Sequence, residues 1–141
     1  MTINLIKLCV GADRVDDLVD WQQRLLRMSE GTELEGHPHH TTRMFPKRRD
    51  ELLAGGSIYW VIAGQIQARQ RILDLREVQT NDGRKCMIVL DPELHRTRLI
   101  ARKPFQGWRY LDVKDAPADL EGGEGGEDLP IRAELAELGL L

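Results

Sequence analysis

The strongest constraint on the fold lies in residues 57–91, where successive β-strands follow one another with short turns between them. Residues 57–63 are apolar on both faces, which is typical of a strand in the middle of a sheet or beside a pocket. After Gly64, residues 65–78 alternate between polar and apolar side chains. The apolar phase slips near Ile72-Leu73, so we expect one inserted residue, a β-bulge, at that point.

Four further segments complete the predicted sheet. Asn81-Asp82-Gly83 is typical of a tight hairpin turn and predicts that residues 85–91 return beside the preceding strand. Residues 3–10, 95–102 and 108–113 also have the composition of strands.

Two segments have the pattern of helices. Residues 13–28 carry apolar side chains at helical spacing, and Asp13 is a suitable N-cap. A shorter helix is expected over residues 47–54, with Pro46 at its start and Gly55-Gly56 as its stop.

These elements predict an α+β fold, with a small, strongly curved mixed sheet or partial β-barrel and two main helices. We expect residues 1–120 to form a single α+β domain. Residues 121–129 are rich in glycine and acidic residues and are expected to be a linker. Residues 130–141 are expected to form a short amphipathic C-terminal helix.

Charge is unevenly distributed along the chain. Residues 37–110 contain fourteen Lys/Arg and seven Asp/Glu, whereas the segments on either side are acidic and the whole chain has a formal net charge of −3. A basic middle that also contains aromatic residues favours a site for a polyanion or an aromatic base.

Six cationic side chains are the candidate phosphate ligands. Arg69 and Arg71 are two residues apart on a predicted strand, so both should point to the same face, where guanidinium groups can bind phosphate in bidentate geometry. The start of the helix after Pro46 would add free backbone N–H groups. The alternative is a solvated strand face whose arginines pair with nearby carboxylates. The candidates are Arg43, Lys47, Arg48, Arg69, Arg71 and Arg109.

A second set of side chains is suited to contact with a base. Three of the chain's seven aromatic residues fall within residues 105–110, and aromatic rings beside arginines are typical of base-stacking sites. The alternative is that Phe105 and Trp108 fill the core. The candidates for stacking or for reading base edges are Trp60, Trp108, Gln67, Gln106 and His40.

Metal and cofactor binding are not indicated. His37, His39 and His40 lie in a polar, turn-rich stretch, but no pair of His or Cys has the spacing of a structural zinc site. Cys9 and Cys86 stand in apolar runs, which predicts two buried thiols and a cytoplasmic, reducing compartment. No membrane-spanning or signal segment is expected, and no nucleophile motif is present.

Two long blocks, residues 40–75 and 103–120, resemble a family of short bacterial proteins defined as domain of unknown function 1489. The resemblance covers about residues 3–120 and implies no activity; residues 121–141 are expected to lie outside it.

The helix that ends in Gly55-Gly56, followed by an apolar strand and a long basic strand, also resembles the entry of PUA-like barrels, including their ASCH branch. That resemblance implies binding of RNA or modified bases in a cleft beside the helix. The typical Gly-x-Lys after the helix is absent here, so the amide hydrolysis known in some ASCH proteins is not carried over.

The sequence therefore predicts a cytoplasmic module that binds RNA, a nucleotide or a modified base through an arginine-rich, aromatic-lined cleft. One alternative is a small hydrolase of the same pocket, acting on a modified nucleoside or amide with His40 or Asp50 as acid–base. Another is a protein-interaction module regulated by its acidic tail.

Overall fold

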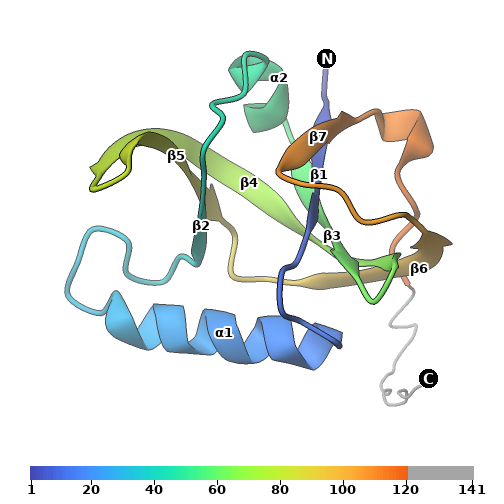
Figure 1. The fold of residues 1–141 in the computed structure, drawn as a ribbon, viewed down its shortest axis with the longest axis horizontal. Helices are drawn as coiled ribbons and strands as arrows, with labels where there is room; N and C mark the ends of the chain where they lie inside the picture. The colour runs from blue at the N-terminus through green and yellow to red at the C-terminus, as the bar shows by residue number, and fades with distance from the viewer. Residues whose placement is uncertain (121–141) are drawn as a thin grey trace.

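The computed structural model describes residues 1–120, which form an α+β domain around a mixed seven-stranded sheet (Figure 1). The predicted linker at 121–129 and the predicted helix at 130–141 lie outside the described residues. The elements are β1 (Asn4–Leu8), α1 (Val15–Met28), β2 (His39–Thr42), α2 (Arg49–Leu53), β3 (Ser57–Ile62), β4 (Gln65–Thr80), β5 (Gly83–Leu90), β6 (His95–Ala101), β7 (Trp108–Leu111) and a 3-10 turn, η1 (Val113–Asp115).

The strand order across the sheet is β2-β5-β4-β3-β1-β7, and β6 pairs with β4 outside this path. The β1–β3 pair is parallel and the other pairs are antiparallel. The predicted α+β class, with a mixed sheet and two helices, is confirmed. Among residues 1–120 the sheet does not close into a barrel, because β2 and β7, at the two ends of this path, do not pair with each other.

Strand β4 organises the sheet because it is sixteen residues long and has different neighbours along its two halves. Its first half pairs with β3 and β6, and its second half pairs with β5. The register with β5 shifts between Ile72 and Asp74, which confirms the predicted bulge. Thr80 pairs with Gly83 across two turn residues, which confirms the predicted hairpin.

Strand β3 separates two apolar clusters. All six of its residues are buried, as expected for a strand between two neighbours. Trp60 belongs to the larger cluster, which also contains Val15 and Leu18 of α1. Tyr59 belongs to a smaller cluster with Leu111, against which Ala116 also packs. The two faces of the sheet are therefore covered by different parts of the chain.

Both helices begin later than the sequence predicted. Helix α1 begins at Val15, and the carboxylate of Asp17 accepts hydrogen bonds from the backbone N–H groups of Asp13 and Arg14. Helix α2 is only five residues long and begins at Arg49, so the prediction that Pro46 starts it is wrong. The physical reason is that the Tyr110 hydroxyl binds the backbone N–H groups of Lys47 and Arg48, which holds these residues outside the helix.

The end of α2 is as predicted, but the two glycines act differently. Gly55 adopts a positive φ of 94°, which an L side chain rarely tolerates. At Gly56 a methyl group would overlap the carbonyl oxygens of Ile3 and Leu52. Gly56 therefore allows β1 and α2 to approach through their backbones.

The polar stretch that contains His37, His39 and His40 is not turn-rich throughout, because His39–Thr42 forms strand β2. This short strand has no apolar alternation of its own. It forms because its backbone pairs with β5, with His40 opposite Ile88 and Thr42 opposite Cys86. Such a long-range pairing leaves little local signal.

The segment between β2 and α2 crosses the gap between the two edge strands. The indole N–H of Trp108 donates to the carbonyl oxygen of Met44 at 3.0 Å. The hydroxyl of Tyr110 accepts hydrogen bonds from the backbone N–H groups of Lys47 and Arg48 at 3.0 and 3.1 Å. These contacts from β7 partly close the sheet with loop backbone instead of strand pairing. Within residues 1–120, no helix is long and apolar enough to cross a membrane.

A buried polar cluster ties α1 to the sheet. The amide groups of Gln22 and Gln70 exchange two hydrogen bonds, at 2.6 and 2.7 Å, and the Gln70 side chain is fully buried. The same Gln70 oxygen accepts the indole N–H of Trp60 at 3.0 Å, and its nitrogen donates to the carbonyl oxygen of Asp91. Because buried polar groups are costly when unpaired, this cluster fixes the position of α1 and of the Trp60 ring.

We predict that Gln70→Leu lowers the free energy of unfolding by about 2–4 kcal/mol, because it leaves the Gln22 amide and the Trp60 N–H buried without partners. Adding Gln22→Leu to it should restore part of that loss by removing one unpaired group. Urea denaturation of both variants measures the effect, with Gln23→Leu on the exposed side of α1 as control. Independent, additive losses in the double variant would contradict the coupling.

Candidate ligand cavity beneath helix α1

A cavity of about 90 Å³ lies between α1 and the sheet. Val10, Leu18, Leu25 and Leu90 give it apolar walls. Its remaining walls carry aromatic rings or polar atoms, supplied by β2, β3, α1 and the segment after β1. These side chains are Cys9, Trp21, Gln22, His39, His40 and Trp60.

The wall at β2 and β3 is formed by two rings in contact. His40 and Trp60 lie edge to face, with 5.4 Å between their centroids and 87° between their planes. Trp60 is only 2% exposed, and its indole N–H is held by Gln70. The ring orientation is therefore fixed before any ligand arrives, which reduces the entropy lost on binding.

The His40 imidazole is neutral at physiological pH. Burial, and then the nearby charges of Lys7 and His39, lower the pKa of His40 from 6.5 to about 4. Burial also lowers the pKa of His39. A neutral imidazole offers one N–H donor and one acceptor, a combination that matches the polar edge of a heterocycle.

The outer wall is more accessible. Trp21 on α1 is 37% exposed, and its ring lies against the backbone of Gly11. Because Trp60 lies deep in the cavity and Trp21 near its opening, a flat ligand would meet an indole at both positions. The arrangement suits an aromatic molecule or a single base.

Cys9 does not provide a reactive thiolate. Burial raises the pKa of Cys9 to about 11, despite the opposing charge of Lys7. Cys86 is also buried, with its pKa raised to about 11, mainly by burial. Both cysteines are free and buried, as predicted. A protonated thiol is a poor nucleophile, so neither cysteine is set up for covalent chemistry.

The structure brings only His40 and Trp60, of the predicted site residues, into this cavity. Arg69 and Arg71 lie on the opposite face of the sheet, because they pair in register with Tyr59 and Ser57, whereas Trp60 pairs with Ala68. Arg109 pairs with Ile6 and so belongs to that opposite face as well. The predicted single cleft of arginines and Trp60 is therefore divided between two faces.

Several of the predicted phosphate ligands already have partners. Arg69 forms two hydrogen bonds of 2.7 Å with the Asp119 carboxylate and one of 3.0 Å with Ser57. Arg48 makes a bidentate pair with Glu51 and lies 5.3 Å above the Tyr110 ring. A phosphate at either arginine would compete with a carboxylate.

The other cations are more accessible. Arg109 lies 4.9 Å above the Phe105 ring. Arg43, Lys47 and Arg71 are exposed and form no ion pair with another described residue. Their role as phosphate ligands stays a prediction. The expected free N–H groups near Pro46 are used by the Tyr110 hydroxyl.

The remaining candidates have structural contacts or lie on the surface. Gln67 donates to the carbonyl oxygen of Ile62 at 2.7 Å and so braces the β3–β4 turn. Trp108 is 9% exposed and belongs to the main core, in line with the core alternative. Gln106 is exposed in the loop before β7.

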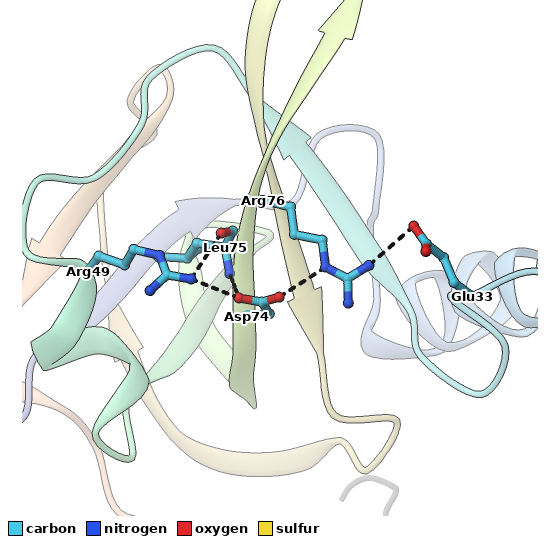
Figure 2. Close-up of polar contacts among 5 residues, drawn as sticks. All are labelled: Glu33, Arg49, Asp74, Leu75 and Arg76. Carbon is cyan, nitrogen blue, oxygen red and sulfur yellow. Dashed lines mark hydrogen bonds and ion pairs between the residues drawn. The ribbon is translucent and has the colours of Figure 1, made fainter.

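A network at the β4 bulge neutralises part of the basic middle (Figure 2). The Asp74 carboxylate accepts from Arg49 at 3.0 Å and from Arg76 at 2.9 Å, and Arg76 also lies 3.7 Å from Glu33. Asp74 further accepts the backbone N–H of Leu75 at 2.8 Å, so it stabilises the irregular backbone at the bulge. Folding thus brings carboxylates next to Arg49 and Arg76, and these carboxylates compensate part of the excess positive charge of residues 37–110.

Among residues 1–120, no group of three or more His, Cys, Asp or Glu side chains is arranged to hold a metal ion. His39 and His40 line the cavity, but the nearby Cys9 does not complete such a group with them.

The comparison with protein families supplies the classification. A family model described as Protein of unknown function (DUF1489) matches residues 5–141. The chain belongs to this family. The match continues to residue 141, so the expectation that residues 121–141 lie outside the family is wrong. No curated protein and no solved structure matches the chain.

Sequence reasoning missed four residues in or beside this cavity: Lys7, Cys9, Trp21 and Gln22. One signal was available, because Gln22 occupies an apolar position of the α1 pattern, and a glutamine there indicates a buried polar partner. Trp21 gave a second signal as a lone aromatic ring among polar helix residues. The strands that pack against Gln22 and Trp21 could not be identified from the sequence, because they depend on the order of strands in the sheet.

We predict that the imidazole of His40 titrates near pH 4 in an NMR pH series, because its charged form is buried beside Lys7. The unfolded chain binds this proton at about pH 6.5. The free energy of unfolding should therefore decrease by about 1–3 kcal/mol as pH falls from 6.5 to 4. His40→Asn should lose that component of the pH dependence. A His40 midpoint at 6.5 would contradict the buried, neutral assignment.

Proposed function

We propose that this domain binds a nucleobase, free or as part of a nucleotide or an RNA end, in the cavity beneath α1. The observation that supports this most is the set of rings around one cavity: Trp60 fixed by Gln70, His40 edge-on to it, and Trp21 at the opening. Stacking of a base on an aromatic side chain contributes about 1–3 kcal/mol.

The polar groups of the cavity fit the edge of a base. Neutral His40 can donate one hydrogen bond and accept another. Gln22 lies in the wall, although its amide already pairs with Gln70. The small volume suits one heterocycle, so an RNA ligand would have to present a single unstacked base.

This proposal changes the role of the cations. With Arg69 and Arg71 on the other face, the arginines would not contact the phosphate of a base bound in the cavity. They would hold a longer RNA only if it wrapped around the domain. A mononucleotide should therefore bind with a shallow dependence on salt, whereas an arginine ladder would give a steep one.

The PUA-like and ASCH-like resemblance belongs to this proposal as a precedent for base binding beside a helix. The helix in question here is α1, not the short helix that ends at Gly55-Gly56. The buried free thiols suit a reducing compartment, and we propose the cytoplasm as the site of action.

Binding is better supported than hydrolysis. Asp50 is exposed on α2 and is not part of the cavity wall, which contains no carboxylate among its residues. His40 is the one predicted acid–base group present, and its low pKa makes it a weak base at neutral pH. Regulation by the acidic tail stays a prediction, since residues 121–141 lie outside the described chain.

We predict that nucleoside monophosphates quench the tryptophan fluorescence of the full chain in a saturable manner. Trp21→Ala should weaken binding about tenfold, because it removes roughly 1.4 kcal/mol of stacking. Phe45→Ala is a matched control, since Phe45 is also 37% exposed but lies outside the cavity. Equal effects of both variants, or no binding of any nucleotide at low salt, would argue against the proposal.

The salt dependence of binding distinguishes a nucleotide bound in the cavity from one bound on the sheet face that carries Arg69 and Arg71. For AMP, the slope of log K against log salt concentration should be about −1 or shallower, as expected for one phosphate contact. Arg71→Gln should leave it unchanged. A slope several times steeper that decreases in Arg71→Gln would favour the arginine face.

A further inference from the structure

Lys7 is a largely buried cation next to Trp60, just outside the residues that line the cavity. It lies on β1 and is 9% exposed. Its register partners are Trp60 on β3 and Trp108 on β7, so its alkyl chain lies between two indoles. The strand alternation places Cys9, a cavity wall residue, on the same face two residues later.

No carboxylate of residues 1–120 pairs with Lys7. Its ammonium makes none of the ion pairs or side-chain hydrogen bonds found among the described residues. The acidic group that influences neighbouring Cys9 is Asp17, and its carboxylate is used to hold the backbone at the start of α1. Lys7 therefore differs from Arg48 and Arg69, which have carboxylate partners.

A lysine side chain that is 9% exposed and has no carboxylate partner loses most of its hydration without gaining a counter-charge, which is costly. Burial lowers the pKa of Lys7, as expected for a desolvated cation. Lys7 pairs in register with Trp60, whose ring contacts His40, and the charge of Lys7 also lowers the pKa of His40. A methionine or leucine at position 7 would fill the same space between the indoles without this cost.

We infer that Lys7 is the anion-binding residue of the cavity, and that the ligand carries one negative group, a phosphate or a carboxylate, close to its aromatic ring. This rests on the proposed binding of a base and narrows it to anionic ring compounds. An anionic group near Lys7 would supply the counter-charge that the described residues lack. The ring would then lie against Trp60 and Trp21.

The charge of the ligand tests this directly. AMP should bind the wild-type chain at least tenfold more tightly than adenosine if the group is a phosphate. Orotate should show the same preference over uracil if the group is a carboxylate. Equal affinities within both pairs would overturn the inference while leaving ring binding intact.

Lysine substitutions test whether Lys7 causes the preference for the anionic compound. Lys7→Met should reduce binding of the anionic compound to the level of its neutral partner and leave the neutral compound unchanged. The same variant should unfold at an equal or higher temperature than wild type, because a desolvated charge has been removed. Lys103→Met, at an exposed lysine, is the matched control and should keep the preference. A preference for the anion that survives in Lys7→Met would overturn the inference.

Two further measurements cover other outcomes. If Lys7→Met does not fold, Lys7→Gln is tested against the same ligand pairs, with the same expected and contrary results. If no ring compound binds, the proposed function fails, and inorganic phosphate becomes the probe. Phosphate should then raise the melting temperature of wild type more than chloride of equal ionic strength, and should not do so in Lys7→Met. Equal responses of the two proteins would overturn the anion site itself.

Discussion

The reciprocal amide pair of Gln22 and Gln70 is the interaction on which the rest of the site depends. It joins α1 to the centre of β4 inside the apolar core, and the same Gln70 oxygen fixes the indole of Trp60. Each partner would leave buried polar atoms unpaired if the other moved. The helix therefore has one favoured position over the sheet, and the cavity between them is formed by that position.

The sheet then separates two kinds of surface. On the α1 side, Trp60 and His40 line a small, largely apolar space, and Lys7 lies next to Trp60 on β1. On the other side, Arg69 is paired with Asp119. Positive charge that appears concentrated in the sequence is thus divided by the alternation of strand residues between faces. This division of charge favours recognition of one small ring in the cavity over binding along a continuous basic groove.

Much of the fold was predictable because its signals are local. The bulge followed from the phase slip near Ile72, and the hairpin followed from Asn81-Asp82-Gly83. Strand β2 was missed because its formation depends on β5, which lies more than forty residues away. The candidate site was predictable only in part. Trp60 and His40 were recognised as candidate site residues. Their contact with each other depends on strand order, and so does the burial of Lys7 beside them. No local sequence pattern encodes that order.

The most direct measurement is an NMR titration of the uniformly ¹⁵N-labelled chain with AMP, following the three indole N–H signals and the backbone amides. We predict that the indole signals of Trp60 and Trp21 shift together with a common dissociation constant, whereas the signal of Trp108, which donates to Met44, stays in place. Shifts confined to the amides around Arg69 and Arg71, with the Trp60 and Trp21 indoles unchanged, would contradict it and place the ligand on the opposite face of the sheet.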